Sequence, residues 1–178
     1  IDGGDAEDDF TLEEFSMPKV SAEALPEQVQ QDTEFLDEVS SLAKDLDIQT
    51  SDILAVIDFE TGGSFSPAQR NAAGSSATGL IQFMAKTAES LGTTTEELAG
   101  MTRKEQMKYV RDYFMQFKDE IKGGDTREVY MAVLFPKAIG KSGDYALFRE
   151  GTTAYAQNKG LDRNGDGIVT KDEAARKV

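Results

Sequence analysis

Apolar side chains recur at intervals of three and four residues along most of the chain after residue 32, which is the spacing of one helix face. The first such stripe consists of Phe35, Val39, Leu42 and Leu46. Residues 53–57 form a continuous apolar run, so we expect a helix that is buried on most sides and closes at Glu60. Further helices are expected at about residues 80–91, 102–117, 126–135 and 144–148. No stretch alternates apolar and polar residues as a half-buried strand does, so the predicted fold class is all-α.

Helix boundaries are marked by capping and stop residues. Two pairs have the spacing of a capping box, in which a threonine and a glutamate three residues later satisfy the first turn. These pairs are Thr94 with Glu97 and Thr102 with Glu105. Gly62 and Gly63 supply a stop after Glu60. Residues 62–79 are dominated by Gly, Ser, Ala, Pro and Asn, which predicts a long surface loop.

Composition excludes several chemistries. The chain has no cysteine and no histidine, which removes thiol catalysis, disulfides, the usual serine triads and imidazole-ligated metals. Acid–base chemistry must fall to carboxylates, tyrosines or lysines, and a bound metal should be a hard cation held by oxygen. No apolar run approaches the ~20 residues of a membrane span, and no signal peptide is visible. Nucleic acid is not expected as a partner, because no basic stripe with interleaved aromatics is present.

Acidic residues are concentrated at the N-terminus. Residues 1–47 contain 15 acidic residues (Asp and Glu) and 2 basic residues (Lys and Arg), whereas residues 48–178 contain 18 acidic and 17 basic residues. Residues 1–31 are polar and interrupted by Pro18 and Pro26, which predicts an extended acidic arm. Two interpretations stay open: a solvated tail, or an arm that docks on a partner or on the domain. The chain starts at Ile1, so we expect it to be processed or excised from something longer.

Glu60 is the candidate acid. A carboxyl group at the end of a buried helix lies among apolar groups, which disfavour its charged form. We expect free carbonyl groups at that helix end to act in the same direction. Both effects raise the pKa, as a general acid for glycosidic cleavage requires near neutral pH. The glycine-rich loop that follows is expected to leave one side open for an extended substrate.

Three segments around Glu60 resemble the soluble lytic transglycosylase domain. They are residues 55–65 (AVIDFETGGSF), 77–84 (ATGLIQFM) and 87–92 (TAESLG). The family has a catalytic Glu followed by a small hydroxyl residue, then a Gly-Leu-(Met/Ile)-Gln segment and a Thr-Ala-x-x-Leu-Gly helix. Tail-associated muralytic domains of bacteriophages are the most similar, because they share the type of ending found at residues 133–136 (VLFP).

The resemblance implies a lysozyme-like helical fold for residues 32–150 and a peptidoglycan substrate, cut between N-acetylmuramic acid and N-acetylglucosamine. It implies that Glu60 protonates the glycosidic oxygen and then acts as base toward the muramyl O6 hydroxyl, giving a 1,6-anhydro product. Gln82 and Thr61 match substrate-binding positions, and Phe83 would floor the cleft. The implied location is a phage virion whose protein opens the cell wall locally in the host periplasm during genome entry. Other virion proteins are the expected partners of residues 1–31.

The chain departs from the family in its second cleft wall. The Ala-Tyr-Asn-Ala-Gly element is absent, and so is tryptophan, so Tyr130 and Tyr155 are the candidates for sugar contacts. For both tyrosines and Phe83 a core position is an equal or better alternative, and the Thr61 hydroxyl can instead bond its own backbone.

Residues 61–88 contain no Asp or Glu, so the loop after the acid supplies no second carboxylate for ordinary hydrolysis. Asp58 is also a poor partner, since two residues along a helix turn it away. A distant carboxylate could still fold into place. A hydrolytic muramidase of the goose type therefore stays open. So does a catalytically silent, calcium-stabilised adaptor.

Residues 162–173 (DRNGDGIVTKDE) match the twelve-residue EF-hand loop at each defining position. The expected calcium ligands are Asp162, Asn164, Asp166, the Ile168 carbonyl, Thr170 through water, and Glu173. Gly167 permits the sharp turn. Since only one loop is present, we expect a structural ion that holds the C-terminal segment, residues 151–178, against the domain.

Overall fold

The predicted helices around the apolar stripes are present in the computed structural model, which describes residues 25–71, 73–176 and 178. The α-helices are α3 (Glu27–Gln30), α4 (Thr33–Leu46), α5 (Thr50–Glu60), α6 (Ala85–Ser90), α7 (Thr95–Ala99), α8 (Arg103–Met115), α9 (Lys118–Ile121), α10 (Thr126–Leu134), α11 (Thr153–Asn158) and α12 (Lys171–Ala175). Two 3₁₀ turns, η2 (Pro136–Ala138) and η3 (Lys159–Leu161), and two strands, β1 (Ala146–Arg149) and β2 (Ile168–Thr170), complete the described elements. The fold is therefore mainly helical.

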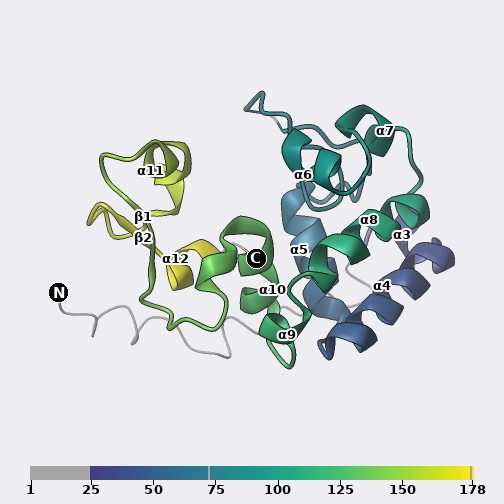
Figure 1. Cartoon of the computed structure of the whole chain (residues 1–178), viewed down its shortest axis with the longest axis horizontal. Helices are drawn as coiled ribbons and strands as arrows, with labels where there is room; N and C mark the ends of the chain where they lie inside the picture. The colour runs from purple at the N-terminus through teal and green to yellow at the C-terminus, as the bar shows by residue number, and fades with distance from the viewer. Residues whose placement is uncertain (1–24, 72, 177) are drawn as a thin grey trace.

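The core lies where α4, α5, α8 and α10 meet. Helix α4 packs against α5 and α8, and α5 packs against α10 on its other side (Figure 1). The α4 stripe of Phe35, Val39, Leu42 and Leu46 is fully buried. Every residue of the run 53–57 is buried as well, which confirms the prediction of a helix covered on most sides. Within the described part of the chain, no helix has the length and apolarity needed to cross a membrane.

The predicted caps at α7 and α8 are present. Thr94 accepts a hydrogen bond from the Glu97 N–H, and Thr102 accepts one from the Glu105 N–H, both at 3.1 Å. Each cap satisfies a backbone N–H that has no partner inside its helix. Helix boundaries that depend on local capping chemistry were therefore readable from the sequence.

Two predicted helices differ from the observed structure. Residues 80–91 were expected to be helical throughout, but residues 78–83 form a hairpin and only α6 is helical. Residues 144–148 were also expected to be helical, but β1 lies there and pairs antiparallel with β2. The reason is tertiary: a lone strand at residues 168–170 leaves backbone groups unpaired, and β1 supplies their partners. The all-α prediction is corrected to a mainly helical fold with one small sheet.

The predicted segment boundaries shift in the described residues. Leu25 and Val29 are buried in the core, so residues 25–31 join the helical domain, while residues 1–24 of the predicted arm lie outside the described residues. At the other end, β1 pairs with β2, so the C-terminal module begins before residue 151. Figure 1 shows this module, with α11, β1 and β2, on the far side of α10 from α6 and α7.

Candidate functional site

Glu60 is the last residue of α5, between the buried run and the glycine turn. Its side chain keeps some exposed surface but is mostly buried, and burial raises its pKa from the ordinary 4.5 to about 7. No charged group of the described residues contributes to this shift. Among residues 25–71, 73–176 and 178, no hydrogen bond or ion pair to this carboxyl group is found. Glu60 is therefore a carboxyl group whose environment favours the protonated form.

The expected contribution of free carbonyl groups at the helix end is wrong. The Ile57 carbonyl accepts the Thr61 N–H at 3.0 Å and the Thr61 hydroxyl at 2.7 Å. The next two N–H groups, of Gly62 and Gly63, bond to the carbonyls of residues 59 and 58 at 3.2 and 2.8 Å. These carbonyls are satisfied by the turn, so burial is the cause of the raised pKa of Glu60.

Thr61 stabilises the helix end. Its side chain is only 2% exposed, and its hydroxyl accepts the Phe65 N–H at 2.9 Å in addition to its bond with Ile57. Phe65 has a positive φ of 50°, which a buried non-glycine residue adopts only when its surroundings hold it there. Of the two interpretations of Thr61, the geometry favours the structural one, because the hydroxyl bonds to the backbone at the end of the helix.

Two tyrosines lie within electrostatic range of Glu60. Burial raises the pKa of Tyr113 to about 12 and that of Tyr130 further, and the Glu60 carboxylate adds to both shifts. Tyr130 is 3% exposed, and its ring packs edge-on against Phe59 with 5.4 Å between centroids. The Tyr113 hydroxyl donates to the Ala132 carbonyl on α10. Tyr130 is therefore a buried residue near Glu60. Tyr113 also lies near Glu60, and the sequence did not indicate it because no motif surrounds it.

Residues 78–83, which belong to the second of the three segments quoted for the family resemblance, form a tight hairpin. Thr78 and Phe83 exchange two backbone hydrogen bonds, of 3.0 and 2.9 Å, and the turn between them requires positive φ at Gly79 (87°) and Gln82 (55°). Phe83 is 2% exposed, and its ring lies edge-on to Tyr113 at 6.5 Å. Phe83 is therefore a core residue, and its contact places the base of the hairpin beside the tyrosine that neighbours Glu60.

A buried glutamine of α8 holds this hairpin. Gln106 is fully buried, and its side-chain oxygen accepts the Leu80 N–H at 2.7 Å. Its side-chain nitrogen donates to the carbonyls of Pro67 and Leu98, both at 2.9 Å. A Cβ at Gly79 would lie 2.4 Å from the Gln106 oxygen, so only glycine fits there. Gln106 was also missed, since an isolated polar residue on a helix usually faces solvent.

The Gln82 side chain is held in one orientation. Its nitrogen donates to the carbonyls of Gln69 at 3.0 Å and Gly79 at 2.9 Å, and two carbonyl acceptors require the NH₂ end of the amide there. In the described part of the chain nothing donates to its side-chain oxygen, and the residue is partly exposed. Gln82 can therefore accept a hydrogen bond from a hydroxyl or amide group of a ligand.

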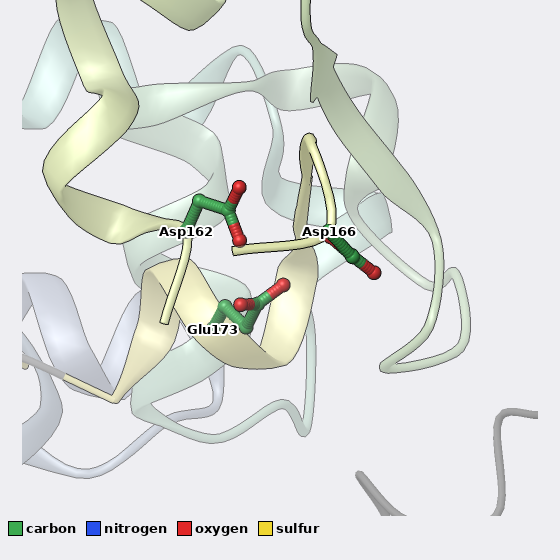
Figure 2. Close-up of side chains that lie close together, drawn as sticks. All are labelled: Asp162, Asp166 and Glu173. Carbon is green, nitrogen blue, oxygen red and sulfur yellow. The ribbon is translucent and has the colours of Figure 1, made fainter. Parts of the chain in front are cut away.

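The acidic loop at residues 162–173 gathers its carboxylates. Asp162, Asp166 and Glu173 each place an oxygen within 4.8 Å of the others, with Glu173 coming from α12 (Figure 2). Asp162 accepts the N–H groups of Gly165 and Gly167, both at 2.9 Å, and Gly167 has the positive φ (82°) expected of the sharp turn. These three residues could hold a metal ion.

The remaining predicted ligands lie in the same loop and are also bonded to it. The Asn164 side-chain oxygen accepts the Asp166 N–H at 3.1 Å, and Asp166 accepts the Ile168 N–H at 2.9 Å. The Thr170 hydroxyl accepts the Glu173 N–H at 3.2 Å and so caps α12. The donor set offers only oxygen, which suits a hard divalent cation.

Tyr155 belongs to this loop and not to the surroundings of Glu60. Its hydroxyl donates to Asp162 at 2.6 Å, and this bond raises the pKa of Tyr155 to about 12. Figure 1 places its helix, α11, across the molecule from α6, which follows the hairpin. The prediction that Tyr155 contacts the same ligand as Gln82 is therefore wrong. The sequence does not indicate this position, because only the tertiary structure determines how far residues 153–158 lie from residues 78–83.

The described residues thus place two tyrosines near the buried carboxyl group of Glu60, and the hairpin that carries Gln82 contacts one of them, Tyr113, through Phe83. Comparisons of the chain with protein-family models, with the curated proteins and with the solved structures find no match. The chemistry of these residues is the ground on which a function can be inferred.

Proposed function

We propose that the protein is a peptidoglycan lytic transglycosylase in which Glu60 is the single catalytic carboxylate. The observation that carries the proposal is that burial raises the Glu60 pKa to about 7, with no contribution from a charged group in the part of the chain that the structure describes. A carboxyl group that keeps its proton near neutral pH can protonate a leaving oxygen. The resemblance of residues 55–65, 77–84 and 87–92 to the transglycosylase family supports the choice of substrate.

The finer description of the fold, a lysozyme-like domain, is part of this proposal. Its support is the order of elements: a buried helix ending at Glu60, a glycine turn, and a hairpin whose Phe83 reaches the tyrosine beside the acid. No described residue donates to the Gln82 side-chain oxygen, which can therefore accept from a sugar hydroxyl or an N-acetyl N–H.

In the proposed reaction Glu60 gives its proton to the glycosidic oxygen between N-acetylmuramic acid and N-acetylglucosamine. The bond from that oxygen to the muramyl C1 breaks, and the substrate's own N-acetyl carbonyl stabilises the positive charge at C1. The Glu60 carboxylate then takes the proton of the muramyl O6 hydroxyl, and O6 bonds to C1. The acid is restored, and the product carries a 1,6-anhydro ring without water having been consumed.

A single carboxylate favours this route over hydrolysis. Ordinary glycosidases place two carboxyl groups about 5–10 Å apart across the bond that breaks. Within residues 25–71, 73–176 and 178, no acidic group contributes to the Glu60 pKa, and Asp58 on the same helix is no exception. The alternatives are a hydrolytic muramidase of the goose type and a silent adaptor, and product analysis separates all three.

The test is digestion of purified peptidoglycan, with mass spectrometry of the released fragments. Wild type should release anhydro-muropeptides, and Glu60→Gln should be slower by on the order of 10²–10⁴-fold. The matched control is Glu89→Gln, which removes an exposed glutamate from the neighbouring α6 and should retain wild-type activity. Fragments that carry the added water would support the muramidase, and no release by wild type would support the adaptor.

The resemblance to tail-associated muralytic domains extends the proposal to location. The protein would be carried in a phage virion, act on the cell wall in the host periplasm, and open it locally during genome entry. The part of the predicted arm that precedes residue 25 would contact other virion proteins. Mass spectrometry of purified virions would detect its peptides, and their absence would contradict this location.

The proposed calcium ion has a structural role. The carboxylates of Asp162, Asp166 and Glu173 are close enough to share an ion, and every donor in the loop is oxygen, so the residues fit calcium. Each carboxylate oxygen has two lone pairs, so the backbone hydrogen bonds to these groups leave capacity for a cation. Bound calcium would supply the positive charge that holds three acidic groups together.

A further inference from the structure

The last residues of the acidic loop are also the first turn of α12. Thr170 is the N-cap, and Glu173 is the third helical residue, whose carboxylate accepts the Thr170 N–H at 3.1 Å. Glu173 also accepts the Arg163 N–H from the beginning of the loop, at 2.8 Å. A cation held by the loop therefore fixes the start of α12 as well, because Glu173 belongs to both.

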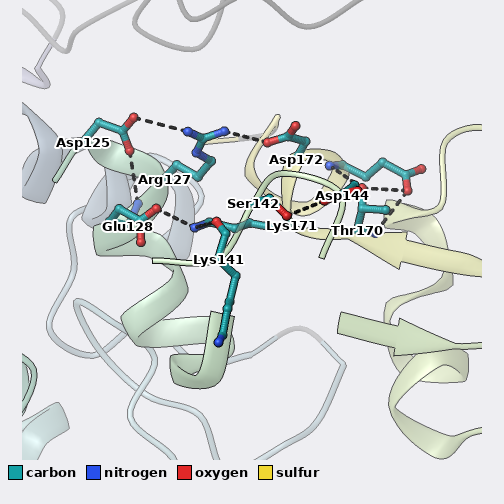
Figure 3. A network of polar contacts seen from close by, with 10 residues as sticks. Asp125, Arg127, Glu128, Lys141, Ser142, Asp144, Thr170, Lys171 and Asp172 are labelled. Carbon is teal, nitrogen blue, oxygen red and sulfur yellow. Dashed lines mark hydrogen bonds and ion pairs between the residues drawn. The ribbon is translucent and has the colours of Figure 1, made fainter. Parts of the chain in front are cut away.

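The same turn is joined to α10 by two ion pairs, which we call the α12 clamp. Lys171 is fully buried, and its ammonium group donates to the Glu128 carboxylate and, at 2.8 Å, to the Lys141 carbonyl (Figure 3). The second pair joins Arg127 to Asp172 at 2.7 Å. Both partners of each pair lie in the first turn of their helix, so the starts of α10 and α12 are held together.

The Lys171–Glu128 pair gives this connection its strength. A buried ammonium group has lost its water, so separation from its carboxylate would leave an uncompensated charge. Glu128 also accepts the Gly140 N–H at 2.7 Å, which ties the segment between the two helices to the same carboxylate. Helix α12 therefore cannot move away from α10 without a large electrostatic penalty.

One turn further along, α10 forms the wall beside Glu60. Tyr130 packs against Phe59, and the Ala132 carbonyl accepts the Tyr113 hydroxyl. Glu60 lies within electrostatic range of both tyrosines. Helix α10 thus contacts α12, which carries Glu173 of the acidic loop, at one end and the surroundings of the Glu60 carboxyl group one turn further along.

We infer that calcium binding at residues 162–173 regulates the Glu60 site, because the buried Lys171–Glu128 pair of the α12 clamp transmits the order of the loop to α10. This inference rests on the proposed calcium ion and, for its effect on catalysis, on the proposed role of Glu60. Calcium holds the loop and α12, α12 holds α10, and α10 keeps the buried wall around Glu60 in place. Without calcium, α10 opens more often at residues 129–132.

The test is hydrogen–deuterium exchange of the full chain with and without calcium. In wild type, calcium should slow exchange in residues 162–175 and, by about tenfold, at the amides of residues 129–132. In the double variant Lys171→Met/Glu128→Met, which replaces both charges and so leaves neither uncompensated, the slowing should be confined to residues 162–175. The matched control is Lys141→Met, an exposed lysine whose side chain points away from the buried pair (Figure 3), and it should behave as wild type.

The outcomes separate the proposals. Slowing of the loop without slowing of α10 in wild type overturns the inference and leaves the calcium ion in place. No slowing anywhere overturns both. Slowing of α10 in the double variant equal to that in wild type also overturns the inference, because the buried Lys171–Glu128 pair would not be the connection. Wild-type activity of Glu60→Gln in the digestion assay would overturn the proposed function and would leave the exchange result unchanged.

Discussion

Glu60 and Asp162 carry the same chemical group in opposite environments. Glu60 is mostly buried, accepts no hydrogen bond from a described residue, and has its pKa raised to about 7. Asp162 is bonded to the Tyr155 hydroxyl and to two backbone N–H groups, and these bonds lower its pKa. The first environment favours a proton on the carboxyl group, and the second favours a negative charge that can attract a cation. Position in the fold therefore decides between acid chemistry and ion binding.

The two regions also differ in the range of the contacts that build them. The bonds of Asp162 reach Tyr155, seven residues away, and Gly167, five residues away. The hairpin near Glu60 depends on Gln106, whose bonds to Leu80 and Pro67 span 26 and 39 residues. The acidic loop can thus form its geometry locally, whereas the Glu60 site exists only in the folded domain.

Calcium removal should have the largest effect on stability. An ion present at a thousandfold excess over its Kd stabilises the folded state by about 4 kcal/mol. For a chain of this length, chelation should then lower the Tm by on the order of 10 °C in calorimetry. Asp162→Asn should abolish this difference, and Asp119→Asn, an exposed aspartate on α9, should retain it. An unchanged Tm on chelation would mean that the loop is held by its hydrogen bonds alone.

Gly79→Ala tests the long-range contacts near Glu60, because it should disturb the packing of the hairpin against Gln106. Its φ of 87° and the 2.4 Å approach of a Cβ to Gln106 add strain and overlap, together roughly 3 kcal/mol of lost stability. Gly92→Ala is the matched control: its φ is 84°, but a Cβ there meets nothing within 4 Å, so about 1–2 kcal/mol is expected. Denaturant unfolding measures the free energy of unfolding of both variants. Equal losses would show that the Gln106 side chain moves aside at no cost in stability.

The two regions were not equally predictable. The acidic loop is twelve consecutive residues, so the spacing of its donors indicates their arrangement directly. The helix before Glu60 was also predictable, because five apolar residues in succession have no solvent-facing side. Tyr113 and Gln106 could not be assigned from the sequence, since their partners lie on other helices and hairpins. The same holds for β1, whose strand conformation depends on pairing with β2.

Glu60→Gln should stabilise the protein at high pH. The folded-state pKa of about 7 lies above the ordinary 4.5, so both states are protonated at low pH and the carboxyl group has no effect there. As the pH rises from 4.5 to 7, the unfolded state ionises while the folded state keeps its proton, and wild-type stability falls. At pH 8 this loss is about 3 kcal/mol.

The glutamine variant has no such loss, so its free energy of unfolding should exceed that of wild type at pH 8 and approach it at pH 4. Glu89→Gln, at an exposed position, should follow wild type at every pH. If the free energy of unfolding of Glu60→Gln does not rise above that of wild type at high pH, the buried environment of Glu60 is not what distinguishes it from Asp162.

Tyr113→Phe should have the smallest effect and tests the tie between α8 and α10. The change removes the hydroxyl that bonds the Ala132 carbonyl and keeps the ring contacts with Phe83, so about 1 kcal/mol of stability should be lost. Tyr109→Phe, on the same helix, is the control, because no hydrogen bond to its hydroxyl is found in the described residues, and it should cost a few tenths of a kcal/mol at most. Chemical denaturation separates the two values. Equal costs would mean that the Tyr113 hydroxyl contributes nothing, and that aromatic packing alone joins the helices around Glu60.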